Sequence, residues 1–252
     1  MNIFTILLIA LLVFMIIKTI PTAYQTKARK LYADGDYEAS KAVIEKLIDK
    51  GKADVTLKTE YAYLLLKTGK FEKAEQTVNN ILCGSLKPQQ RSKAVILRCI
   101  CYDKNNNTQE AYDDLLELYN DGYRSMNLYG LLGYLKIKMH IDEKETYNFC
   151  AEAYDYADDD RDICDNMLIC CLRAGEFEKA RELSSYLLEE YPDFIEGYYH
   201  SAQLDVALKD FSAAKDKLNK VSDCTRSFMT TVSQEEIDEL SEQIDKLSEV
   251  NE

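Results

Sequence analysis

The chain has 252 residues, a formal net charge of −13, 30% charged residues and only three prolines. This length allows one or two ordinary domains or one repeat array. Few prolines and many charged residues favour a helical soluble part, and so acidic a chain is not expected to bind nucleic acid. The charge is uneven: residues 1–150 carry a net +3 and residues 151–252 a net −16. The first part therefore suits an anionic membrane surface better than the second.

An apolar segment opens the chain. Ile3 to Ile17 contains no charged residue, and Lys18 follows it directly. As a helix, the run to Ile20 would span about 27 Å at about 1.5 Å per residue, close to the hydrocarbon core of about 30 Å. We therefore expect a single transmembrane anchor over residues 1–20, with Lys18 reaching the headgroups.

Two other interpretations of this segment remain open. A cleavable signal peptide needs a basic start and a small-residue cleavage site, and the sequence offers neither in good form. A buried core helix would need partners that cover it on all sides. For an anchor, the positive-inside rule places the soluble part in the cytoplasm. This orientation follows from the basic residues on the C-terminal side of the apolar run, which are Lys18, Lys27, Arg29 and Lys30.

A repeat of 34 residues follows the apolar segment. Gly35 and Gly69 lie 34 residues apart, and each precedes an aromatic residue by two positions and a small residue by five. The pattern returns at Gly175, and once more without glycine after Lys209. Such a glycine ends a helix in the left-handed conformation. The aromatic residue fills the wedge between two antiparallel helices, and the small residue lets the helices approach closely.

The repeat predicts about six helical pairs. Four pairs show it in full, and they begin near Pro21, Val55, Arg161 and Ile195. The third pair replaces the turn glycine by residues 103–108, and the fourth turns at residues 139–142. A polar helix over residues 233–250 opens with the capping box Ser233-Gln234-Glu235-Glu236 and is expected to cover the end of the array.

In these features the sequence resembles the tetratricopeptide repeat family over residues 21–225. The resemblance implies an α-solenoid over these residues. Together with the apolar segment before it and the polar helix after it, the expected fold is all-α: a transmembrane helix, an α-solenoid and a C-terminal capping helix. It also implies a peptide-binding groove lined by the first helix of each pair. The groove candidates are Arg29, Tyr32, Tyr63, Lys67, Ile169, Arg173, Tyr199 and Gln203. The basic residues among them would suit an acidic or C-terminal carboxylate ligand; the alternative for each is an ordinary exposed side chain.

The sequence contains no recognisable catalytic motif. His140 and His200 are the two histidines, and neither has a partner at metal-ligand or nucleophile spacing. None of the eight cysteines forms a C-x-x-C pair, so we expect buried thiols in a reducing compartment, no metal and no cofactor. We therefore predict a membrane-tethered, non-catalytic scaffold for a protein or peptide partner. The alternatives are a structural subunit of a membrane assembly or secretion complex, and an enzyme with an unrecognised site.

Overall fold

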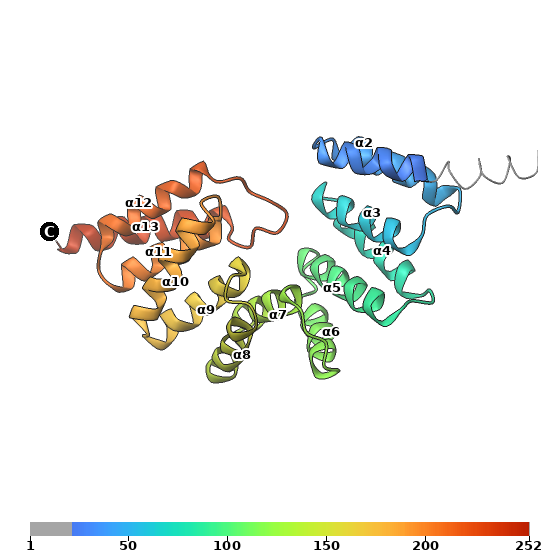
Figure 1. Ribbon diagram of the computed structural model, residues 1–252. Coiled ribbons are helices and arrows are strands. Elements are labelled where there is room, and N and C mark those ends of the chain that lie inside the picture. Colours follow the sequence, from blue (N-terminus) through green and yellow to red (C-terminus); the bar gives the residue numbers. More distant parts are fainter. Residues whose placement is uncertain (1–21, 252) are drawn as a thin grey trace, which may run out of the picture. The chain divides into compact units, whose positions relative to one another are not determined.

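The computed structural model describes residues 22–251. The predicted anchor at residues 1–20, with Ile3, Ile17 and Lys18, lies outside this range. All regular structure within the range is helical, which confirms the all-α prediction (Figure 1). Between residues 22 and 251, no helix combines the length and the apolar character that a membrane span requires.

The helices follow one another as consecutive pairs. The first pair joins helical residues 22–33 to α2 (Tyr37–Asp49). The later pairs are α3 (Val55–Lys67) with α4 (Phe71–Leu82), α5 (Pro88–Lys104) with α6 (Thr108–Asn120), α7 (Met126–Lys138) with α8 (Glu143–Tyr156), α9 (Arg161–Ala174) with α10 (Phe177–Glu190), and α11 (Ile195–Ala207) with α12 (Phe211–Lys220). A short 3-10 helix, η1 (Val221–Asp223), and a final helix, α13 (Gln234–Asn251), follow them.

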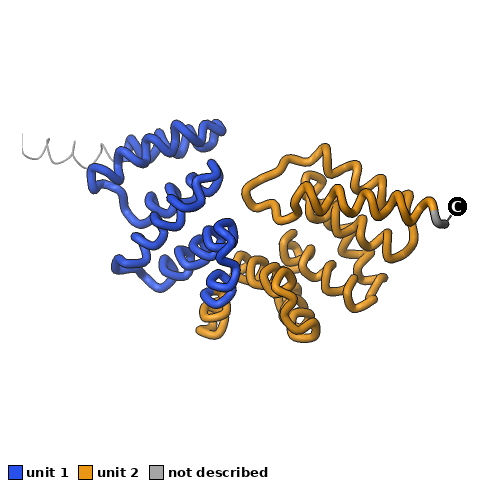
Figure 2. Tube along the Cα trace, turned by 180° about the vertical axis from the view of Figure 1, so that it is seen from behind, with its two compact units in different colours: residues 1–114 blue, residues 115–252 orange. Residues whose placement is uncertain are grey.

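The chain divides into two compact units after Asp114, within α6 (Figure 2). Residues 22–114 carry 16 Lys and Arg against 13 Asp and Glu, a net of +3. Residues 115–251 carry 14 against 30, a net of −16. The first unit is therefore basic and the second acidic, although the units divide after residue 114 and the charge was compared across residue 150 in the sequence.

Every one of the six pairs turns at a left-handed residue. Glycine takes this position in three pairs, at Gly35, Gly69 and Gly175, with φ of 80°, 70° and 75°. The other three pairs use Asn106, His140 and Lys209, with φ of 64°, 52° and 62°. The amide after each of these residues donates a hydrogen bond five residues back, from Asp36 to Leu31 and from Asp210 to Asp205 for example. This is the Schellman helix end, so one turn geometry serves all six pairs despite their different sequences.

Small residues fill the helix crossings, as the repeat predicts. The buried small residues at these positions include Ala28, Ala62, Ala74, Cys99, Ala111, Ala180, Ala202 and Ala214. The predicted capping box also forms, because Ser233 N donates to Glu236 Oε2 at 2.7 Å and Glu236 N donates to Ser233 Oγ at 3.1 Å. From this start α13 packs mainly against α12 and closes the second unit.

Candidate functional site

Four side chains form a half-exposed group in the first unit, which we call the tyrosine–lysine cluster: Tyr32, Tyr37, Tyr63 and Lys67. The Gly35 turn brings Tyr32, at the end of the first helix, against Tyr37, at the start of α2, with ring centroids 5.3 Å apart. Lys67 comes from α3, and its Nζ atom lies 4.0 Å from the Tyr37 centroid and 5.2 Å from the Tyr32 centroid. Tyr63 lies one helical turn before Lys67, and Tyr32 and Tyr63 are each 37% exposed.

The Lys67 ammonium is held in its charged form. Its hydrogen bond with Tyr37 is the largest cause of a raised pKa, burial opposes it, and nearby Tyr32 and Tyr63 add to the rise. Burial raises the pKa of Tyr63, so this phenol stays neutral. Among residues 22–251, no carboxylate lies in ion-pair contact with Lys67. The cluster therefore presents an uncompensated cation together with flat aromatic surface, an arrangement that suits an anionic group.

Arg29 lies one helical turn before Tyr32, and its Nη2 atom lies 2.9 Å from Glu60 Oε1 on α3. Both side chains are partly exposed, so this ion pair adds little stability. The structure thus brings together four of the predicted groove residues in the first unit: Arg29, Tyr32, Tyr63 and Lys67. Tyr37 and Glu60 were not among the groove residues predicted from the sequence. Tyr37 was assigned to packing, because it occupies the repeat position that normally fills the wedge between helices.

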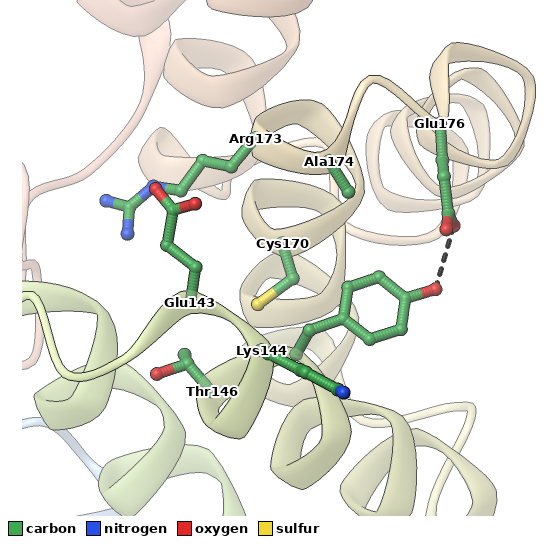
Figure 3. Close-up of a pocket in the computed structure, with 8 residues that line it drawn as sticks. Glu143, Lys144, Thr146, Cys170, Arg173, Ala174 and Glu176 are labelled. Carbon is green, nitrogen blue, oxygen red and sulfur yellow. Dashed lines mark hydrogen bonds between the residues drawn. The ribbon is translucent and has the colours of Figure 1, made fainter.

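Arg173 borders a pocket of about 280 Å³ in the second unit, built from the start of α8 and the end of α9 (Figure 3). The pocket mixes charges of both signs with polar and thiol groups, and its lining is Glu143, Lys144, Thr146, Tyr147, Cys170, Arg173, Ala174 and Glu176. On one wall the Tyr147 hydroxyl donates to Glu176 Oε2 at 2.8 Å. Ile169 on the same helix is half-buried.

The predicted groove residues of the sixth pair lie in a different environment. Tyr199 is 8% exposed and belongs to a core that includes Leu240 and Ile244 of α13. Burial raises the pKa of the Tyr199 phenol, and Gln203 is half-buried. The structure therefore places Tyr199 beneath the final helix rather than on an open surface. The repeat alignment did not reveal this position, because it does not include the packing of α13.

Buried polar pairs in the second unit connect helices. Asn166 Nδ2 on α9 donates to the Gly130 carbonyl of α7 at 2.8 Å. Lys217 of α12 pairs with Asp205 of α11, and His200 pairs with Asp165. Over the described part of the chain, no group of His, Cys, Asp and Glu could hold a metal ion. These polar groups stabilise helix packing, and His200 takes part as a structural residue.

Comparison with known proteins identifies the fold. No protein-family model matches the chain, and no curated protein resembles it in sequence. A tetratricopeptide repeat protein from Parabacteroides merdae has 14% identity and a TM-score of 0.59, with 89% of this chain and 98% of that chain covered. Pseudomonas aeruginosa pilF has 13% identity and a TM-score of 0.64 over 88% and 97%. The Cut9–Hcn1 hetero-tetramer of the APC/C gives 12% identity and a TM-score of 0.70 over 90% and 43%.

At these identities the likeness concerns the fold alone. The chain has the fold of tetratricopeptide repeat proteins, built from consecutive helix pairs with a shared turn. Repeat proteins of this kind typically act through their surfaces in protein–protein and peptide binding rather than in catalysis, and the matched Cut9 structure is itself a complex with Hcn1.

Proposed function

We propose that this protein is a non-catalytic scaffold that binds an acidic segment of a protein partner at the tyrosine–lysine cluster. We further propose that residues 1–20 tether it to a membrane, with the helix pairs on the cytoplasmic side. The observation that carries the binding proposal is Lys67, whose ammonium lies over the rings of Tyr32 and Tyr37 and has no carboxylate in ion-pair contact within the described range.

The cluster supplies the two contributions that peptide recognition needs. Tyrosines provide large, stiff contact surfaces at low entropic cost, which is why they dominate binding hot spots. The Lys67 ammonium can donate charge-assisted hydrogen bonds to a carboxylate, which are about twice as strong as neutral ones. Arg29 lies one turn from Tyr32, but its ion pair with Glu60 offsets its charge, so Lys67 is the cation that the proposal uses.

The charge of the two units supports an acidic ligand at the first unit. With a net of +3, residues 22–114 attract an anionic segment, whereas residues 115–251, with a net of −16, repel it. An acidic partner is therefore expected to use the first unit and to bind more weakly as the salt concentration rises.

The membrane proposal has its support in the sequence. Residues 3–17 are apolar without interruption, and the basic residues Lys18, Lys27, Arg29 and Lys30 follow them. Cys83 is exposed in the first unit and provides a reporter of sidedness. A membrane-impermeant maleimide is expected to label Cys83 in inverted vesicles and to leave it unlabelled in sealed right-side-out vesicles. Labelling in both preparations, or full-length protein free in the supernatant after ultracentrifugation, would contradict this proposal.

The binding proposal is tested with the full chain in nanodiscs and fluorescein-labelled peptides of acidic, neutral and basic composition. Fluorescence anisotropy should show tightest binding to the acidic peptides. Lys67→Gln should weaken that binding about tenfold, as the loss of a charge-assisted hydrogen bond predicts. Lys70→Gln, which removes an exposed charge three residues further on, is the matched control and should leave affinity nearly unchanged. Equal binding of all peptides, or equal effects of both variants, would refute the proposal.

A further inference from the structure

One end of the first unit gathers the loops that join successive helix pairs. The first helix and α2 run antiparallel, and Ser40 Oγ donates to the Ala28 carbonyl at 2.8 Å between them. The loop after α2 therefore lies near the start of the first helix. The loop after α4 lies at the same end, because α3 and α4 form the next antiparallel pair, and Figure 1 shows both loops beside the start of the described chain. We call this surface the loop end, and it comprises residues 22–27, 46–58 and 83–91.

The loop end carries the basic charge of the first unit. It contains seven Lys and Arg against two Asp and no Glu, a net of +5, whereas the rest of the unit has a net of −2. The cations are Lys27, Lys46, Lys50, Lys52, Lys58, Lys87 and Arg91. Over residues 22–251, none of these seven has a carboxylate in ion-pair contact, because the ion pairs of the first unit use other cations. The loop end is therefore an uncompensated positive surface.

The proposed anchor enters the first unit at the loop end. Thr22 is the first described residue, and five peptide steps separate it from Ile17, the last residue of the apolar run. Five steps span at most about 18 Å. A membrane that holds Ile17 therefore keeps the loop end close to its surface. Tyr24, in the first turn of the helix, is 41% exposed, and tyrosine is enriched where a membrane meets water.

Two lysines of the loop end extend past the start of the first helix. With Ser40 opposite Ala28, the antiparallel packing places Lys46 about level with Thr22. The chain continues beyond this level to Lys50 and Lys52, both of which are exposed. These two side chains are therefore well placed to meet a surface on the side where the described chain begins.

The tyrosine–lysine cluster lies at the opposite end of the same unit. Tyr32 follows Thr22 by ten residues of helix, a rise of about 15 Å. Lys67 comes just before the turn after α3, where Lys41 Nζ donates to Thr68 Oγ1 at 3.3 Å. The first unit can therefore meet a membrane at one end and a partner at the other.

We propose that the loop end binds the headgroups of anionic lipids and so orients the first unit with the tyrosine–lysine cluster away from the membrane. This proposal rests on the membrane tether of the proposed function, and it adds the lipid class and the contacting residues. Charge complementarity supports it, because an anionic leaflet strengthens binding about fivefold for each Lys or Arg near its surface. The tether favours a lipid over an acidic protein at this end, since it holds the loop end beside the membrane at high effective concentration.

The test measures how closely Cys83, the exposed thiol of the loop end, approaches the headgroups. The full chain carries a fluorophore on Cys83, and Cys224→Ser removes the other cysteine that is not buried. The chain is placed in nanodiscs whose lipids include a nitroxide quencher on the headgroup. We expect strong quenching when phosphatidylglycerol is mixed with phosphatidylcholine, and weak quenching in phosphatidylcholine alone or at high salt. Equal quenching in the two lipid compositions would overturn the proposal, and this comparison needs no change to a loop-end lysine.

Two double variants locate the surface. Lys50→Gln with Lys52→Gln should lower the ratio of docked to undocked protein in anionic nanodiscs about 25-fold, at about fivefold for each lysine. Lys30→Gln with Lys70→Gln removes the same charge from exposed positions toward the opposite end and should leave the quenching nearly unchanged. Equal effects of the two double variants would contradict the assignment to the loop end. Weaker binding of acidic peptides by the loop-end variant, with its quenching unchanged, would identify a peptide site there instead of a lipid site.

Elution with the nanodiscs separates this proposal from the membrane tether. A full chain that elutes with both lipid compositions, yet shows no lipid-dependent quenching, would retain the tether and refute lipid binding at the loop end. Elution with anionic nanodiscs alone would refute the inserted anchor and support the basic surface. Elution with neither composition would overturn both proposals.

Discussion

The Nδ1 atom of His200 lies 2.8 Å from Oδ1 of Asp165, and this contact joins α11 to α9 inside the second unit. The side chains of both residues are largely shielded from solvent, at 13% and 8% exposed. Burial lowers the pKa of His200, but the charge and hydrogen bond of Asp165, with further charge from Glu196 and Glu236, raise it above its ordinary value of 6.5. Folding therefore favours the protonated imidazole.

This pair predicts a stability that depends on pH. Because the pKa of His200 is higher in the folded than in the unfolded chain, the stabilisation is complete below pH 6.5 and is lost as the pH rises through the folded pKa. We expect the free energy of unfolding in urea to fall as the pH rises above 6.5, and His200→Gln to flatten this dependence. His140→Asn alters the other, exposed histidine and should preserve it. An unchanged slope in His200→Gln would show that other groups cause it.

Gly133 is predicted to be needed for the close approach of α7 and α9. A Cβ atom at this position would lie 2.8 Å from Asn166 Nδ2, and that amide already donates to the Gly130 carbonyl. Gly133→Ala should therefore lower the free energy of unfolding by about 1–3 kcal/mol through overpacking. Gly130→Ala is the matched control on the same helix, because its nearest contact would be a milder 3.3 Å to Asp162 Cβ. Equal stability of the two variants in urea would contradict this account.

The left-handed turn after α11 predicts a stabilising substitution. Lys209 occupies the position that glycine takes in three other pairs, with φ of 62°. A side chain costs free energy in this conformation and glycine does not. Lys209→Gly should raise the free energy of unfolding by about 1 kcal/mol, whereas Gly175→Ala at the equivalent turn should lower it by a similar amount. Thermal unfolding measures both, and a lower melting temperature for Lys209→Gly would refute the prediction.

Glu196 is predicted to hold the segment that connects η1 to α13. Its Oε1 atom accepts from Thr231 N at 2.6 Å and from Thr231 Oγ1 at 3.2 Å, and Glu196 itself is buried. Glu196→Ala should leave the Thr231 amide without its partner and increase hydrogen exchange and proteolysis in residues 224–233. Thr231→Val removes only the hydroxyl bond and should have a smaller effect. If hydrogen exchange and proteolysis of this segment are the same in both variants as in the wild type, Glu196 has no such role.

Local features of the sequence predicted the helices and their ends. The capping box at Ser233 and the glycine turns at Gly35, Gly69 and Gly175 depend on residues only a few positions apart, so they can be recognised without a structure. The turns at Asn106, His140 and Lys209 were harder to recognise, because these residues adopt the left-handed conformation without the glycine that marks it. Even so, the predicted turn segments of the third and fourth pairs contain Asn106 and His140.

The sequence by itself therefore determined the helix pairs, their turns, and the basic and acidic parts of the chain. Only the tertiary structure decided that Tyr199 lies beneath α13 and that Lys67 lies over the rings of Tyr32 and Tyr37. The physical reason is the range of the interactions. Turn and cap hydrogen bonds join residues within a few positions, whereas burial and side-chain pairing depend on helices separated by tens of residues, whose packing a repeat pattern does not encode.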